Sequence, residues 1–150
     1  MPLFVNKTEI TDDQVFNEMQ FHPAQSRVEA RNEAAKALLI RELMRQEAVR
    51  EGFISEVVDE EVLDMGIMKL VEAQVTAPEA SEAMCRRYYD QNVERFRISK
   101  NSALPQEFSK VEAKIQDYLH TRSMRQGIQS YILDLAGNAK ISGFDLAASL

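Results

Sequence analysis

Two histidines and one cysteine, His22, His120 and Cys85, are the residues of this sequence best suited to catalysis or metal binding. Imidazole groups transfer protons and bind metals near neutral pH, and a cysteine thiolate is both a nucleophile and a metal ligand. These functions need several groups that converge, but neither histidine has a partner at a ligand spacing such as H-x-x-x-H, and Cys85 has no histidine nearby in sequence. We therefore predict structural roles for all three, and no catalytic residue, metal site or cofactor. Cys85 is interpreted as a small core residue, with a reactive thiol as the alternative.

Acidic residues are concentrated between Glu56 and Asp64. They lack the D-x-[DN]-x-[DN]-G pattern of a calcium-binding loop. Acidic side chains in the first turn of a helix interact favourably with the positive end of its dipole. We interpret this cluster as a solvated helix start rather than as a metal site.

Methionine and aromatic side chains indicate a different kind of chemistry, the non-covalent binding of polypeptide. Met65 and Met68 lie among other apolar residues, and methionine adapts its shape to varied partners. Tyr88, Tyr89 and Phe96 are close together in sequence and are suited to an aromatic groove for extended peptide. These five residues are our candidates for peptide binding. The alternative for both sets is an ordinary helical core.

Helical segments must position these side chains. Capping-box patterns begin at Thr11, Ser26 and Thr76, and apolar residues at helical spacing follow each of them. The pattern predicts a mainly α-helical fold with helices over 12–21, 26–51, 55–75, 76–93 and 105–136. We expect the third helix to be weakened at Gly66 and the last to be interrupted at Gly127.

Glycine and proline indicate several of the helix ends. Gly52 and Gly137 are suited to the left-handed position just past a C-terminus. Pro105 is suited to the first turn of the last helix. The polar residues from 97 to 104 have no hydrophobic period, so we expect a loop there.

Two short segments are strand-like, residues 3–5 and residues 139–144. Neither is stable unpaired, so we expect the two termini to pair as short strands. We also expect the N-terminal and C-terminal helical segments to pack together.

Composition limits the class of protein. The 150 residues are 45% hydrophobic and 28% charged, which is ordinary for a globular chain long enough to bury a core. The formal net charge of -6 disfavours nucleic acid and anionic membranes as partners. No segment approaches the roughly 18 apolar residues of a spanning helix, and the first residues do not form a signal peptide. We expect a cytoplasmic protein, although a processed exported form would look the same at its N-terminus.

Several segments of the chain carry a resemblance to a known family. In order, they read EMQFHPAQS (18–26), AAKALLIRELMRQEA (34–48), CRRYYDQNVERFR (85–97), FSKVEAKIQDYL (108–119) and LAGNAKISGFDL (135–146). Together they resemble the parvulin-type peptidyl-prolyl isomerase family, including the SurA-like chaperones. The subgroup that includes the nitrogenase iron-protein maturation isomerases has a similar EMQ-x-HPA and RELL-x-QEA pattern.

In such proteins a tyrosine-rich helix ending in N-x-x-x-F, here residues 92–96, is followed by the catalytic rotamase domain. Residues 98–104 leave room only for a loop. The resemblance therefore implies a SurA-like multi-helix chaperone domain from which the parvulin domain is missing. We predict a single domain over 1–150, with an N-terminal helical segment (1–97), a loop (98–104) and a C-terminal helix and strand (105–150).

The resulting hypothesis is a non-catalytic, chaperone-like domain that binds unfolded or nascent polypeptide. One alternative is a peptidyl-prolyl cis-trans isomerase with residual activity. Another is an assembly domain that mainly forms homodimers. Client aggregation, proline isomerisation and the dependence of mass on concentration are the measurements that separate the three.

Overall fold

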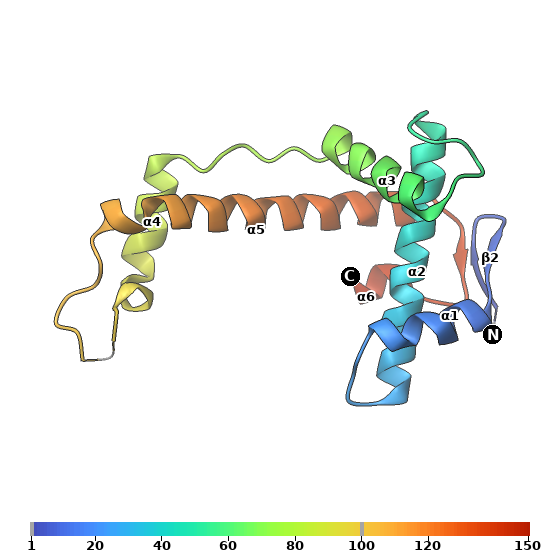
Figure 1. Ribbon diagram of the computed structural model, residues 1–150, viewed down its shortest axis with the longest axis horizontal. Helices are drawn as coiled ribbons and strands as arrows, with labels where there is room; N and C mark the ends of the chain where they lie inside the picture. The colour runs from blue at the N-terminus through green and yellow to red at the C-terminus, as the bar shows by residue number, and fades with distance from the viewer. Residues whose placement is uncertain (1, 100) are drawn as a thin grey trace. The chain divides into compact units, whose positions relative to one another are not determined.

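The computed structural model describes residues 2–99 and 101–150, and it is mainly helical with one small antiparallel sheet, as expected. The chain divides into two compact units. The first consists of Met1–Val75 together with Ile128–Leu150, and the second of Thr76–Gly127. Figure 1 shows the elements of both units in chain order. The single domain expected from the sequence stays a prediction.

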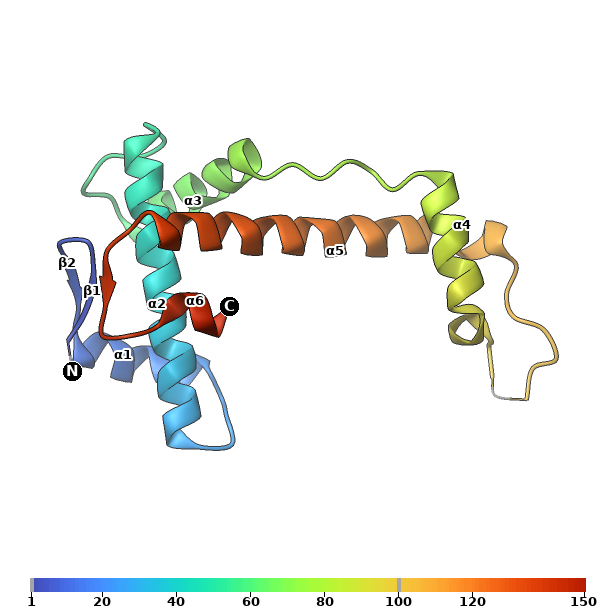
Figure 2. The same cartoon turned by 180° about the vertical axis from the view of Figure 1, so that it is seen from behind.

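Both termini contribute strands to the sheet of the first unit. Strand β1 (Leu3–Val5) pairs on one side with β2 (Thr8–Ile10) and on the other with β3 (Ile141–Ser142), both antiparallel. In Figure 2 the C-terminal strand lies beside β1. The predicted pairing of the termini is confirmed. Strand β2 was not predicted from the sequence, and it makes the sheet three-stranded.

Asn6 holds the hairpin between β1 and β2 to the C-terminal strand. Its backbone has a left-handed φ of 56°, which a hairpin turn requires and asparagine tolerates. Its side-chain oxygen accepts a hydrogen bond from the backbone N–H of Lys140, and its amide donates to Gln46. One polar side chain therefore fixes the turn to two other segments of the unit.

Three elements follow the hairpin: α1 (Asp12–Glu18), a single 3₁₀ turn η1 (Met19–Phe21) and the long helix α2 (Arg27–Arg50). Thr11 forms the predicted capping box with Gln14. Ser26 accepts a hydrogen bond from the N–H of Glu29 at the start of α2. Gly52, with a φ of 83°, lies in the left-handed position that was predicted just past the end of α2.

The core of the first unit has two parts along α2. One part packs α2 against the sheet, α1 and the short C-terminal helix α6 (Leu146–Ser149). The other packs the second half of α2 against α3 (Glu60–Gln74) and the last turns of α5, with Leu70 and Ala48 fully buried. Burial of this apolar surface is the main force that holds the N-terminal and C-terminal parts of the chain together.

Helix α3 begins five residues later than predicted. The side chain of Asp59 caps it by accepting a hydrogen bond from the N–H of Val62. Gly66 is buried within this helix and faces Ile54, where a larger side chain would overlap. The expected weak point is therefore a close packing contact.

The second unit contains α4 (Glu82–Gln91), the 3₁₀ turn η2 (Val93–Phe96) and the first part of α5 (Phe108–Gly137). Its core is formed by Cys85 on α4 and by one face of α5, with Ala80 before α4; the face of α5 consists of Phe108, Val111, Ile115 and Leu119.

Four details predicted for this region were wrong. Ser81 caps α4, so the Thr76 pattern opens no helix. Pro105 precedes α5, which begins at Phe108. Helix α5 runs through Gly127 without a break, and Gly137 is its last residue with no left-handed φ. The α5 end is instead held by Asn138, whose backbone and side chain both donate to the carbonyl oxygen of Asp134.

The predicted loop over 98–104 contains no helix or strand in its described residues, and Lys100 lies outside them. Arg97 and Ser102 are joined by a hydrogen bond of 2.8 Å across this loop. Over the part of the chain that the structure describes, no helix combines the length and the apolar character needed to cross a membrane.

Candidate functional site

The three residues with the strongest potential for chemistry are divided between the two units. His22 in the first unit lies 3.1 Å from the carboxylate of Glu18, one helical turn earlier. His120 and Cys85 belong to the second unit. Residues 2–99 and 101–150 contain no group of three or more His, Cys, Asp or Glu side chains that is placed to hold a metal ion.

Cys85 is a core residue, as predicted. Its side chain is almost completely buried in the second unit. Burial raises the pKa of its thiol, and the nearby carboxylates of Glu112 and Glu82 raise it further. A neutral, buried thiol is a poor nucleophile, so the core interpretation is favoured over a reactive cysteine.

The acidic cluster at the start of α3 has the structural role that was predicted. Asp59 caps the helix, and Glu60 and Asp64 form ion pairs of 2.6 and 2.8 Å with Arg41 of α2. Burial alone would lower the pKa of Arg41, but its hydrogen bonds to Asp64 and Glu60 outweigh burial and raise it. These acids therefore fix the start of α3 to α2.

The five predicted peptide-binding residues are divided between the two units. Met65 and Met68 lie on α3 in the first unit, and their side chains are 55% and 62% exposed. The other three lie in the second unit, where Tyr89 stacks on Phe96 with ring centroids 5.1 Å apart and Tyr88 meets Phe96 edge-on at 6.2 Å. Tyr89 also donates a hydrogen bond of 2.5 Å to the carbonyl oxygen of Gln106.

The aromatic residues are thus half-buried against their own core, whereas the two methionines are available at the surface. Their role in peptide binding stays a prediction. Both sets contain side chains that reach solvent, and neither is a completely buried core.

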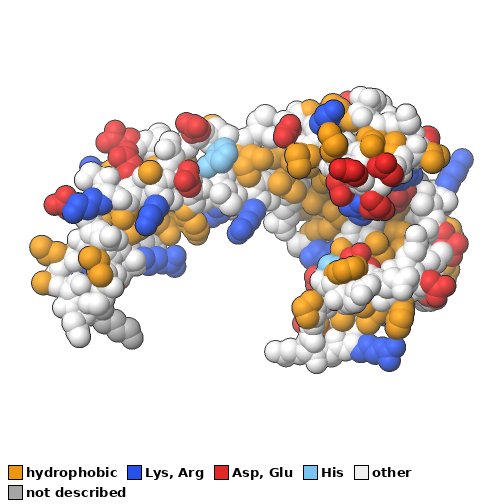
Figure 3. Space-filling model, viewed as in Figure 1, with side chains coloured by type: hydrophobic (Ala, Val, Ile, Leu, Met, Phe, Trp, Pro, Cys, Tyr) orange, Lys and Arg blue, Asp and Glu red, His pale blue; other side chains and the backbone are white. Residues whose placement is uncertain are grey.

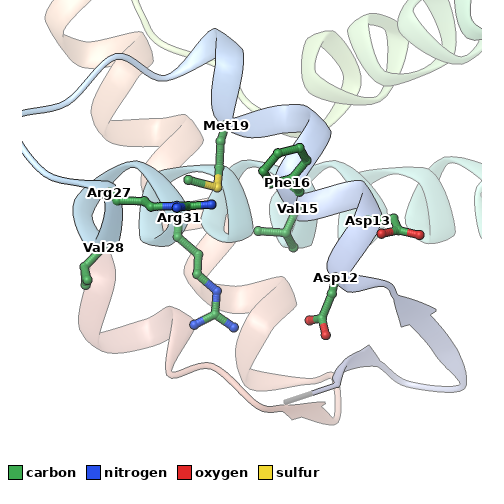
Figure 4. A pocket seen from close by; sticks show the side chains of 8 residues that line it. All are labelled: Asp12, Asp13, Val15, Phe16, Met19, Arg27, Val28 and Arg31. Carbon is green, nitrogen blue, oxygen red and sulfur yellow. The ribbon is translucent and has the colours of Figure 1, made fainter.

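A more distinct apolar site lies between α1 and α2 in the first unit, and we call it the α1–α2 groove (Figure 4). It encloses about 550 Å³. Its apolar side chains come from both walls: Val15, Phe16 and Met19 from α1 and η1, and Val28 from the first turn of α2. Phe16 is 63% exposed and Val28 is 71% exposed.

Charged residues lie on two sides of the α1–α2 groove. Asp12 and Asp13 belong to the first turn of α1, and Arg27 and Arg31 to the first two turns of α2. In Figure 4 the acids lie on one side and the arginines on the other, with Val15, Phe16 and Met19 between them and Val28 beyond the arginines. The groove therefore combines an apolar centre with opposite charges on either side of it.

A second cavity of the first unit, of about 910 Å³, is bounded by η1, α2, α3 and the last turns of α5. Its apolar wall includes Phe21, Leu38, Ile67 and Ile132, and its polar edge includes the ion-paired Arg41. Figure 3 shows hydrophobic side chains at the surface over α2 and α3, beside a group of acidic ones. The first unit thus offers two apolar concavities on either side of η1, which contributes residues to both.

Sequence reasoning missed Phe16, Phe21 and Val28. For Phe16 and Phe21 the signal was a large apolar side chain in a helix and turn of only ten residues, which are too short to bury a wide apolar surface. Val28 lies in the first turn of α2. The convergence of the three side chains depends on the turn at His22 and Pro23 between η1 and α2, which no periodicity records.

Comparison with known proteins gave no match, whether to a protein-family model, to a curated protein or to a solved structure. The likeness to parvulin-type isomerases therefore depends only on the sequence segments quoted above.

Proposed function

We propose that this protein is a chaperone-like module that binds exposed apolar segments of non-native polypeptide. The observation that carries the proposal is the α1–α2 groove, where Phe16 and Val28 face solvent across an apolar depression. Large exposed apolar groups that gather in one concave place are typical of a binding surface. The resemblance to SurA-like chaperones supports the same class of function.

The size and composition of the groove suit side chains of an unfolded chain. A volume of about 550 Å³ lies in the range of small-molecule pockets and accommodates a few apolar side chains. Each valine, leucine or phenylalanine that becomes fully buried contributes about 1.5–3 kcal/mol. Met19 in the wall adapts to different shapes, which favours binding of varied sequences.

Binding of a client segment in the α1–α2 groove requires no covalent step. A client segment that occupies the groove is removed from the pool of exposed segments, so association between client molecules slows in proportion to the bound fraction. Met65 and Met68, exposed on α3 of the same unit, are further contacts in this proposal. Tyr88, Tyr89 and Phe96 in the second unit contribute only through their exposed edges.

To test the proposal, the thermal aggregation of a client protein is followed by light scattering in the presence of this protein. We expect the wild-type protein to suppress scattering and the double variant Phe16→Ser, Val28→Ser to lose most of that effect. Both side chains are exposed, so their replacement leaves the core intact. The matched control is Val57→Ser, which removes a 91% exposed valine of the same unit that does not line the groove.

Two results would overturn the proposal. One is a wild-type protein that leaves the scattering of several clients unchanged. The other is a double variant that suppresses aggregation as well as the Val57→Ser control does.

The same groove also favours a second candidate, the homodimerising assembly domain. A second copy that covers Phe16 and Val28 would remove the same apolar surface from water. Sedimentation over a hundredfold range of concentration distinguishes the two. A dimer that Phe16→Ser dissociates supports assembly, and a monomer at all concentrations supports client binding.

A further inference from the structure

A pocket of the second unit contains three arginines and two tyrosines, and we call it the Arg–Tyr pocket. We propose that it binds an acidic polypeptide segment, with carboxylates on the arginines and an aromatic or aliphatic side chain against the tyrosines. This site is separate from the α1–α2 groove, so the inference goes beyond the proposed function, and it shares only Tyr88 with the residues named there.

Each helical element of the second unit contributes to the Arg–Tyr pocket. Arg87 and Tyr88 lie on α4, Arg95 on η2, and Tyr118 and Arg122 one turn apart on α5. They enclose about 300 Å³, the size of one or two side chains. Packing of the pocket's own residue Leu119 into the core fixes the α5 wall.

The aromatic rings form the apolar part of the site. The rings of Tyr88 and Tyr118 are 5.2 Å apart between centroids, and the guanidinium of Arg122 lies 5.8 Å from the centre of the Tyr118 ring. Arg95 donates a long hydrogen bond of 3.4 Å to the hydroxyl of Tyr88. These contacts keep two of the three guanidinium groups beside the rings while their remaining N–H groups stay available.

None of the three arginines is neutralised. Among the described residues, Arg41, Arg45, Arg50 and Arg97 each form an ion pair, whereas no carboxylate lies within 4.0 Å of Arg87, Arg95 or Arg122. Residues 76–127 contain nine Lys and Arg against seven Asp and Glu, although the whole chain has 18 against 24. The basic character of this protein is therefore concentrated in the second unit.

A polypeptide is favoured over a nucleic acid as the anionic ligand. The guanidinium fork suits both carboxylates and phosphates. However, a net charge of -6 on the whole chain repels a long polyanion, and the small pocket accepts only a short charged segment. An acidic segment that also carries an apolar residue satisfies both halves of the site.

The experiment uses an end-blocked, fluorescently labelled peptide with two Asp-Phe-Glu triplets, and a matched peptide in which Asn and Gln replace the acids. Binding to the full chain is followed by anisotropy at low salt. We expect saturable binding of the acidic peptide, weaker binding of its amide counterpart, and loss of affinity as salt is added. Arg122→Gln and Arg95→Gln should each reduce affinity about two- to fivefold, as exposed ion pairs do.

The control is Arg125→Gln, which removes the same charge from an exposed position three residues further along α5, outside the pocket. It should bind the acidic peptide as the wild type does, and so should Phe16→Ser, whose defect would concern only the α1–α2 groove. The inference is overturned if Arg125→Gln weakens binding as much as Arg122→Gln, if the amide peptide binds equally well, or if a single-stranded oligonucleotide of equal charge binds more tightly.

Discussion

Gly66 of α3 lies directly against Ile54, so that a methyl group added to the glycine would overlap Cγ2 of Ile54. Ile54 is held in the half-buried layer around Leu70 and Ala48, and its Cγ2 is attached next to the backbone rather than at a flexible end. The absence of a side chain at Gly66 therefore lets α3 approach the segment that follows α2.

Gly66→Ala should destabilise the first unit. Alanine favours a helix by about 1 kcal/mol over glycine, but overpacking of a tight contact costs about 1–3 kcal/mol, so we expect a net loss. The measurement is the free energy of unfolding from urea titration. The control is Gly137→Ala at the end of α5, where an added methyl group meets no atom within 4 Å and the helix preference alone should act. Equal effects of the two substitutions would contradict the contact with Ile54.

Glu42 makes stability depend on acid pH. Burial alone would raise the pKa of this carboxyl, but hydrogen bonds from Arg45 and Gln46 outweigh it and hold the pKa below the usual 4.5. In the unfolded chain Glu42 takes up a proton as the pH falls below about 4.5, whereas in the folded protein it stays ionised to a lower pH. The ionised Glu42 therefore contributes fully to the free energy of unfolding at a pH above its pKa in the unfolded chain. This contribution is lost as the pH falls through its lower pKa in the folded protein.

Substitution of Glu42 by Gln tests this contribution. The variant should be less stable than the wild type at pH 6 and should lose less of its unfolding free energy between pH 6 and pH 3. Urea titrations at four pH values in that range measure both effects. If wild type and Glu42→Gln lose stability in parallel on acidification, the carboxylate does not contribute in this way.

Tyr131 makes the stability of the fold depend on alkaline pH, and in the opposite direction to Glu42. Burial raises the pKa of its hydroxyl to about 12, and the carboxylates of Glu47 and Glu51 add to the effect. Because the unfolded tyrosine ionises near pH 10, the unfolded state loses its proton first and the fold becomes less stable as the pH rises from 10 towards 12. Tyr131→Phe should remove this part of the alkaline loss, measured by urea titration at pH 8 and pH 10.5.

At neutral pH the same substitution should be harmless. The buried Tyr131 hydroxyl has no hydrogen-bond partner among the described residues, so its removal leaves no group unpaired. We expect an unfolding free energy within about 0.5 kcal/mol of the wild type or slightly higher. A loss of 2 kcal/mol or more would show that the hydroxyl is bound in solution.

Local signals in the sequence predicted the features that depend on a few adjacent residues. The cap at Thr11 and the left-handed Gly52 are confirmed, because a side chain or a glycine determines each within one turn. The pairing of the two termini is also confirmed, since short strands need a partner.

Competing local signals and tertiary contacts explain the errors. Ser81 caps α4 although Thr76 carries a capping-box pattern upstream, and propensity alone does not choose between successive caps. The role of Gly66 requires knowledge of Ile54, which helix preference does not contain. The groove depends on two helices that meet across a turn, so Phe16 and Val28 showed no common period.

The rate at which a reagent modifies the thiol of Cys85 tests whether the chain unfolds as the single domain expected from the sequence. Cys85 is the only cysteine of the sequence, and it is buried in the second unit. Burial makes the largest contribution to raising the pKa of its thiol, and the carboxylates of Glu112 and Glu82 raise it further. A thiol reagent at pH 8 should therefore modify it only when the second unit opens, about a hundredfold or more slowly than in the urea-unfolded chain. Ser109→Cys in a Cys85→Ala background places the thiol at an exposed position of the same unit, and it should react at the unfolded rate.

Gly66→Ala then distinguishes one cooperative domain from two independent units. The substitution lies in the first unit and Cys85 lies in the second. If the chain unfolds as a single domain, destabilisation at Gly66 raises the population of the open state and accelerates modification of Cys85 by the same free energy that urea titration records. An unchanged rate at Cys85, together with a lower unfolding free energy of the first unit, would show that the two units unfold separately and that the single-domain prediction is wrong.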